Sequence, residues 1–236
     1  LDSSTNITLV GSSTLDLSGL AAPSITITTG RSLNGSGTVV GSATMATGST
    51  LSVGGSGTNS LGTLTVTNSL VLQNGSSAQM QIAKNGATPV SDLVVATNIT
   101  YGGTLAVTGT GGAFAANDTF KLFSAGTLGG SFGSVSLPVG TTWDTSQLGV
   151  NGTIRVVSVS KPAIRNFAVS NGSPSLTFTG PAGNSYRVWA STNVALPFAN
   201  WTLLVSNGLF GVTGTNTFID ATATNIPARF YLISVP

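Results

Sequence analysis

The chain has 236 residues, with eight Lys and Arg, six Asp, and no Glu, His or Cys. This length allows one large domain or two smaller ones. The absence of Cys excludes disulfides and thiolate metal sites. The net charge of +2 and the scattered cations argue against a nucleic-acid partner. No apolar run approaches the roughly 18 residues that a membrane-spanning helix needs, so we expect no membrane span.

Ser and Thr together number 66 and Gly 31, whereas charged residues are only 6% of the chain. Thr and Val favour strands, and Gly, Asn and Ser favour turns, so the composition predicts an all-β protein. A surface built from hydroxyl and backbone groups is typical of secreted proteins. We therefore expect an extracellular or cell-surface location, with any signal peptide already removed.

Residues 7 to 60 repeat with a period of 18. Three blocks align as ITLVGSSTLDLSGLAAPS, ITITTGRSLNGSGTVVGS and ATMATGSTLSVGGSGTNS. In this alignment Ile7, Ile25 and Ala43 are equivalent, as are Leu15, Leu33 and Leu51. A unit this small cannot bury its own apolar face and must stack on a neighbour. We predict a short right-handed parallel β-helix with coils of about 18 residues. The alternative is an antiparallel two-sheet sandwich.

Residues 61 to 107 continue the pattern as alternating strands. Apolar side chains from Leu64 to Ile82 fall on even positions, which places them on one buried face. With three residues inserted, Leu64 and Leu72 continue the 18-residue register. After Asp92 the apolar phase moves to odd positions, beginning at Leu93.

Residues 112 to 159 are rich in aromatic side chains. An open solenoid end exposes apolar ladders and must be covered, so this segment is predicted to form a C-terminal cap. The first domain therefore spans 1–159. Trp143 beside Asp144 fits either the cap or a sugar-binding platform.

The segment from Ser160 to Pro162 is predicted to be a linker. The pattern of residues 162–236 then predicts six or seven strands in a small antiparallel β-sandwich of the fibronectin III or immunoglobulin type. This part has four cations and one acid, Asp220, whereas the preceding part has four cations and five acids. Trp189 and Trp201 fit the core of the sandwich or a platform for polysaccharide, and the core interpretation is preferred.

Several segments resemble a known class of bacterial proteins. GTLTVTNSLVLQNGSSAQMQI, SDLVVATNITYGGTLAVTG and TWDTSQLGVNGTIRVV resemble autotransporter-associated β-strand repeat proteins, over roughly residues 43 to 157. That resemblance implies secretion, a β-helical stalk and surface display. FTGPAGNSYRVWAST, NWTLL and PARFYLI resemble the small C-terminal β-domains on secreted proteins of Verrucomicrobia-like bacteria. Gln79 and Gln81 stand where the repeat proteins would carry acidic residues.

Catalytic chemistry is poorly supported. General acid–base catalysis most often uses His, which is absent, and Glu is absent too. Asp92, Asp118 and Asp144 lie far apart in sequence, although stacking of coils could bring them together. Asp16, Asp118, Asp144 and Asp220 stand alone, without the ligand spacing of a calcium loop. We expect no catalytic, cofactor-binding or metal site, and no cofactor.

The leading functional hypothesis is a structural one. We expect an extracellular subunit of a head-to-tail filament or surface layer, whose partner is a second copy of the chain and whose inter-subunit strand includes Thr5, Ile7 and Leu9. One alternative is an adhesin or carbohydrate-binding surface module, with a polysaccharide or a cell surface as partner, that uses Trp143, Trp189 and Trp201. The other alternative is a fragment of a polysaccharide-active enzyme.

Overall fold

The computed structural model describes residues 6–54, 60–110, 114–170, 172–224, 226 and 228–235. The chain divides into two compact units. Unit 1 comprises residues 1–110, 117–137 and 143–156, and unit 2 comprises 111–116, 138–142 and 157–236. None of the described helices is long and apolar enough to cross a membrane.

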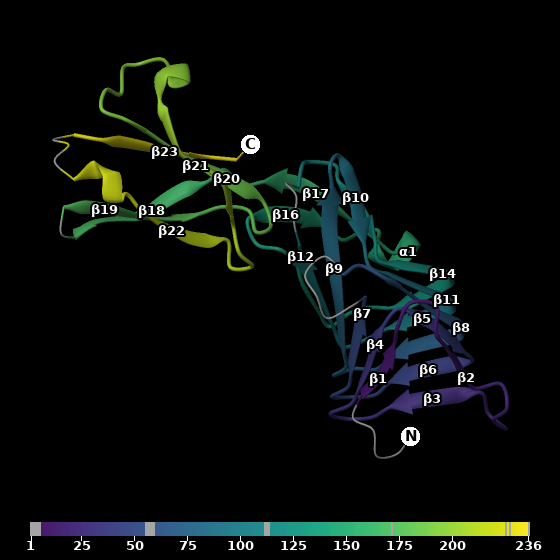
Figure 1. Ribbon diagram of the computed structural model, residues 1–236. Coiled ribbons are helices and arrows are strands. Elements are labelled where there is room, and N and C mark those ends of the chain that lie inside the picture. The colour runs from purple at the N-terminus through teal and green to yellow at the C-terminus, as the bar shows by residue number, and fades with distance from the viewer. Residues whose placement is uncertain are drawn as a thin grey trace. The chain divides into compact units, whose positions relative to one another are not determined.

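Unit 1 is a parallel β-solenoid of about five turns. Its strands lie side by side from purple to teal in Figure 1. The first sheet contains, in spatial order, β1 (Asn6–Leu9), β4 (Ser32–Gly35), β7 (Thr50–Val53), β9 (Ser77–Asn85), β12 (Thr104–Gly109) and β15 (Ser134–Ser136). The second contains β2 (Thr14–Asp16), β5 (Gly37–Val40), β8 (Thr63–Leu72), β11 (Leu93–Tyr101) and β14 (Phe123–Gly130). β6 (Ser42–Met45) pairs with the second half of β8, and β3 (Ser24–Ile27) pairs with β6.

Apolar ladders run from coil to coil inside the solenoid. In the first sheet one ladder comprises Ile7, Leu33, Leu51, Ala78, Leu105 and Val135. Leu33, Leu51 and Leu105 have no exposed surface. Because each strand repeats the alternation of its neighbour, stacking buries one continuous face. This confirms the predicted solenoid and excludes the antiparallel alternative for residues 6–54.

The predicted coil length is right for one coil and wrong for the others. Leu33 pairs with Leu51, 18 residues later, but Ile7 pairs with Leu33, 26 residues later. The predicted equivalences of Ile7 with Ile25 and of Leu15 with Leu33 are therefore wrong. Turn residues between β2 and β3 lengthen the first coil at a corner, where insertions do not disturb the stacked strands.

The later register differs as well. Leu64 pairs with Gly37 and Leu70 with Ala43, 27 residues apart in each case. In β11, Val94 and Ala96 are buried whereas Leu93 is only half-buried, so the predicted change of phase after Asp92 is wrong. The phase changes instead at a bulge between Ala96 and Asn98. In β11 the odd positions become buried only from Ile99 onward. The extra residue of the bulge lies in β8, where three steps from Val66 to Ser69 oppose two steps from Ala96 to Asn98.

Aromatic side chains gather at the last coil of unit 1. The ring of Tyr101 lies 5.0 Å from that of Phe123 and 4.7 Å from that of Phe132, and its hydroxyl donates to the carbonyl of Leu148 at 3.1 Å. Leu148 begins α1 (Leu148–Asn151). A small sheet of β13 (Thr119–Lys121), β17 (Thr153–Val159) and β16 (Thr141–Asp144) follows, and β10 (Thr88–Ser91) forms a hairpin with β9.

Unit 2 contains two antiparallel three-stranded sheets. One comprises β18 (Ala163–Ser170), β19 (Ser173–Thr179) and β22 (Thr215–Ile219), and the other β21 (Thr202–Leu209), β20 (Ser185–Ser191) and β23 (Phe230–Ser234). Two single-turn 3-10 helices, η1 (Phe198–Asn200) and η2 (Ala221–Ala223), lie between strands. The buried core draws on both sheets and consists of Leu176, Phe178, Tyr186, Val188 and Phe210.

The division of the chain differs from the predicted 1–159 and 162–236 domains in three short stretches. Residues 111–116, 138–142 and 157–159 belong to unit 2. Backbone bonds explain this, because Ser160 N–H donates to Gly140 O at 2.7 Å and Ala182 N–H to Val139 O at 3.0 Å. The predicted linker at Ser160 is therefore held within unit 2.

Candidate functional site

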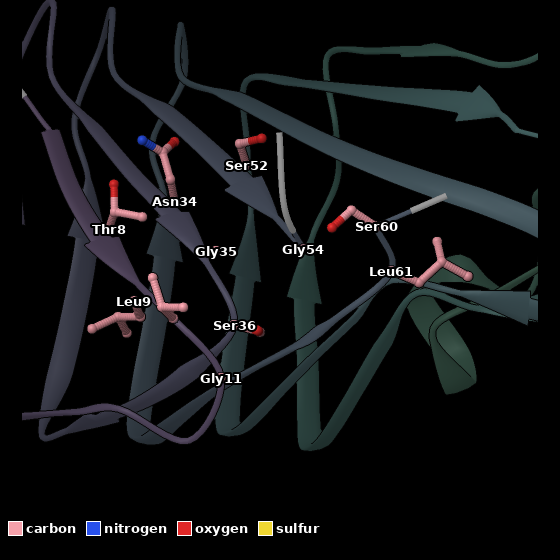
Figure 2. Close-up of a pocket in the computed structure, with 11 residues that line it drawn as sticks. Thr8, Leu9, Gly11, Asn34, Gly35, Ser36, Ser52, Gly54, Ser60 and Leu61 are labelled. Carbon is pink, nitrogen blue, oxygen red and sulfur yellow. The ribbon is translucent and has the colours of Figure 1, made fainter. Parts of the chain in front are cut away.

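A hollow in unit 1 lies where the strands of the first sheet end. It has a volume of about 560 Å³, and Thr8, Asn34 and Ser52 line it from three successive strands. Figure 2 shows these three side chains along one row, with Ser60 and Leu61 farther to the right, beyond Gly54. Among the described residues that line the hollow none has an ionisable side chain, so they offer hydrogen bonds to a neutral ligand.

Two glycines shape the corner of this hollow. Gly35 and Gly54 have φ of 94° and 80°, in the region that disfavours residues with a side chain. A Cβ at Gly35 would lie 1.9 Å from Leu9 O, and one at Gly54 would lie 2.2 Å from Ser60 O. The backbones of adjacent coils therefore approach each other more closely here than any other residue type would allow.

The first coil has an open edge within the described part of the chain. β1, β2 and β3 each pair with one strand only, β4, β5 and β6 respectively. Their inward residues Ile7, Leu15 and Ile25 are half-buried, whereas the partners in the second coil, Leu33, Val39 and Ala43, are fully buried.

The structure thus places two of the three residues of the predicted inter-subunit strand. Ile7 and Leu9 lie on β1, with Leu9 buried at 6% exposure. Thr5 lies outside the described residues. Unpaired N–H and C=O groups on such an edge can accept another strand.

Asp92 is a fully buried carboxylate between two coils. Its oxygens accept the backbone N–H of Gly62 at 2.8 Å and of Gln81 at 2.6 Å. Burial raises the pKa of Asp92 to about 6, and these two N–H donors oppose the shift. The side chain therefore joins neighbouring coils.

We expect the stability of unit 1 to fall by about 2–3 kcal/mol as the pH rises from 4 to 7, because one pKa unit corresponds to about 1.4 kcal/mol. The folded state keeps the Asp92 proton to about pH 6, whereas the unfolded chain loses it near 3.8. The folded state binds more protons in that window, so stability falls with pH and then levels off above pH 6. Urea unfolding at several pH values measures this slope.

Asp92→Asn should flatten the slope, because the amide does not titrate. Asp16→Asn is the matched control, since Asp16 lies on the exposed surface, where its carboxylate accepts the backbone N–H of Ser18 at 2.8 Å. An unchanged slope in Asp92→Asn would show that another group carries the pH dependence.

The other carboxylates of unit 1 are separately engaged. Asp118 pairs with Lys84 at 2.9 Å, and Asp144 with Arg155 at 3.1 Å. Stacking therefore does not bring Asp92, Asp118 and Asp144 into one site. Among the described residues no group of three or more acidic, His or Cys side chains is placed to hold a metal ion.

The three tryptophans fall into two places. Trp143 is half-buried in unit 1, with its ring 5.9 Å from that of Phe120. Trp189 and Trp201 lie in unit 2 on either side of Phe198, at ring distances of 4.8 and 6.2 Å. The three tryptophans therefore do not form the single predicted platform. Trp189 and Trp201 form an aromatic group with Phe198, which the sequence analysis did not indicate.

Trp189 and Trp201 lie outside the core of unit 2, so the preferred core interpretation is wrong. Trp189 points away from that core, since its neighbours Val188 and Ala190 are buried. Its cross-strand partners Leu203 and Leu232 are 41% and 38% exposed. The indole N–H groups donate within the unit, to Ser234 Oγ from Trp189 and to Leu196 O from Trp201. The ring surfaces form an aromatic patch on the outer face of this sheet.

Neither protein-family models, nor curated proteins, nor solved structures contain a match to this chain.

Proposed function

We propose that this chain is an extracellular structural protein, a subunit of a head-to-tail filament or surface layer assembled through exposed β-edges. The open edge of the first coil carries the proposal: three strands with one pairing partner each, and inward side chains that are only half-buried. In this proposal the solenoid is a right-handed parallel β-helix, and unit 2 is a β-sandwich of the fibronectin III or immunoglobulin type.

The neighbour must offer an edge other than the last coil. At that end of the solenoid the ring of Tyr101 packs on Phe132 and its hydroxyl bonds to Leu148. A further coil therefore cannot stack there. β18 is an edge strand of its sheet, and Phe167 and Val169 in its second half are 54% and 60% exposed. A contact between the first coil of one copy and β18 of the next is heterologous, and such contacts form open fibres when the rotation does not close.

Negative-stain imaging and sedimentation of the purified chain at micromolar concentration test the assembly. Phe167→Lys and Val169→Lys should each raise the concentration needed for assembly at least about tenfold, because a buried unpaired charge costs more than 1.4 kcal/mol. Val150→Lys is the matched control, since Val150 is 70% exposed on α1. Monodisperse monomers of the unaltered chain, or equal effects of all three changes, would refute the proposal.

The aromatic patch favours a second candidate, a carbohydrate-binding surface module. Aromatic ring faces stack on the apolar faces of sugar rings, and Trp189, Phe198 and Trp201 lie together on one surface. Trp201→Ala should abolish glycan-array binding with the fold retained by circular dichroism. Trp143→Ala, which alters a ring in unit 1, should leave that binding unchanged.

A further inference from the structure

Unit 2 contains a second hollow, of about 250 Å³, with a different chemical character. Two cations, Lys161 and Arg165, line it together with the hydroxyl side chains of Ser160, Thr179 and Thr213. No acidic residue lines it. The hollow lies wholly within unit 2.

Arg165 is positioned by a bulge in β18. The pairing with β19 passes from Ile164 opposite Phe178 to Asn166 opposite Thr177, so Arg165 has no residue opposite it. Bulges of this kind redirect a side chain. The Nε–H of Arg165 donates to Thr179 Oγ1 at 3.0 Å, which orients the guanidinium and leaves its two Nη groups for a ligand.

The positive charge of this hollow has no counterpart among the described ion pairs. The described ion pairs of the chain are Lys84–Asp118, Arg155–Asp144 and Arg229–Asp220. From Lys161 onward the chain has one acid, Asp220, which is buried against Arg229 at 3.0 Å. Lys161 and Arg165 therefore present their charge to solvent or to an anion.

Glycines keep the walls of the hollow free of side chains. Gly140 and Gly214 have φ of 76° and 63°. A Cβ at Gly214 would lie 2.5 Å from Gly180 O, and one at Gly140 would lie 2.6 Å from the Cα of Pro181. The backbone around Gly140 and Gly214 is thus closely packed against Gly180 and Pro181, and no side chain at these two glycines narrows the hollow.

We propose that this pocket binds a single oxyanion, a carboxylate or sulfate group, carried by an acidic polysaccharide. A guanidinium with free Nη groups forms paired hydrogen bonds with a planar or tetrahedral oxyanion, and the ammonium of Lys161 adds a second charge. A pocket with two cations fits one such group. Nucleic acid would instead need many phosphate contacts along a basic stripe, and the cations of this chain are scattered.

The test uses the whole chain and four polymers: polygalacturonate, dextran sulfate, neutral dextran and a DNA duplex. Calorimetry at low salt should detect binding of one or both acidic polysaccharides and none of neutral dextran. The comparison of polygalacturonate with dextran sulfate identifies the carboxylate or the sulfate as the preferred group. Titration with acetate and sulfate alone should show weak binding with the same preference.

Arg165→Gln should weaken polysaccharide binding about tenfold or more, the loss expected for a charge-assisted pair of hydrogen bonds. Arg187→Gln removes the same charge from β20 outside the pocket, so it should change the affinity less than about twofold. Thr179→Val keeps the net charge and the strand but removes the acceptor that orients Arg165, and it should weaken binding about three- to tenfold.

Three results would overturn the proposal. The first is equal weakening by Arg165→Gln and Arg187→Gln, which would indicate attraction by overall charge. The second is Thr179→Val without effect on binding. The third is binding of DNA at least as tight as that of both polysaccharides, or binding of neither polysaccharide. Self-assembly does not enter these measurements when they are made below the concentration at which the chain assembles.

Discussion

Leu51→Ala should lower the free energy of unfolding of unit 1 by about 2–5 kcal/mol, the range for removing a fully buried Leu side chain. Leu51 has no exposed surface and lies in the ladder between Leu33 and Ala78. Its partner in the next coil, Ala78, is already small and cannot fill the space that Leu51 leaves. The surrounding coils are fixed by their own pairing, so the cavity cannot close, and we expect the upper part of the range. Urea unfolding followed by circular dichroism measures the change.

A second substitution tests the register as well as the burial. Ala78→Leu alone should destabilise the unit, since it overfills a packed interior. Combined with Leu51→Ala it should recover part of the lost stability, because the two side chains are direct cross-strand partners and couple by about 0.5–3 kcal/mol. Ser52→Ala, next in the strand but half-exposed, is the control and should have little effect. Additive effects of Leu51→Ala and Ala78→Leu would contradict the pairing.

The sequence predicts which side chains face inward much better than it predicts which strands pair. Leu64 and Leu70 both lie on the predicted buried face, although the predicted pairing between strands was wrong. The insertion of three residues aligned Leu64 with Ala43, whereas Leu70, six residues later, pairs with Ala43. Side chains in a strand alternate with period two, so an even error leaves each residue on its face. Coil length depends on how many residues the corners take up, and corner residues have no periodic pattern. The bulge at Ala96 and Asn98 is invisible for the same reason.

The candidate sites were predictable to different degrees. The open first coil follows from the apolar alternation of Ile7 and Leu9, and the surplus of cations after Ser160 is visible in the composition. The anion pocket was not predictable, because Arg165 meets Thr179 only through an irregular register between two strands. Trp201 and Phe198 are close in sequence, but the outward direction of Trp189 depends on which face of β20 meets the core.

Asp220→Asn should destabilise unit 2 by about 3–5 kcal/mol, the cost of leaving one partner of a buried ion pair without its counter-charge. Asp220 is 2% exposed, and the side chain of Arg229 is 12% exposed. The carboxylate also accepts hydrogen bonds from Tyr231 Oη at 2.9 Å and from the Thr222 hydroxyl at 2.6 Å. An amide cannot accept from all of these donors, because its nitrogen is itself a donor. Urea unfolding of the whole chain, followed by near-ultraviolet signals from Trp189 and Trp201, reports on this unit.

Arg229→Met combined with Asp220→Asn provides the control. Removing both charges should cost less than Asp220→Asn alone, since no unpaired charge is then buried. The pH dependence of unit 2 should also have the sign opposite to that of Asp92. Burial alone would raise the pKa of Asp220, but the bonds from Thr222 and Tyr231 and the charge of Arg229 outweigh it and lower the pKa. The carboxylate therefore stabilises the fold above the unfolded pKa of 3.8, and this stability is lost as the pH falls further. A double variant as unstable as Asp220→Asn alone would show that the hydrogen bonds of Asp220, and not its charge, hold this end of the sheet together.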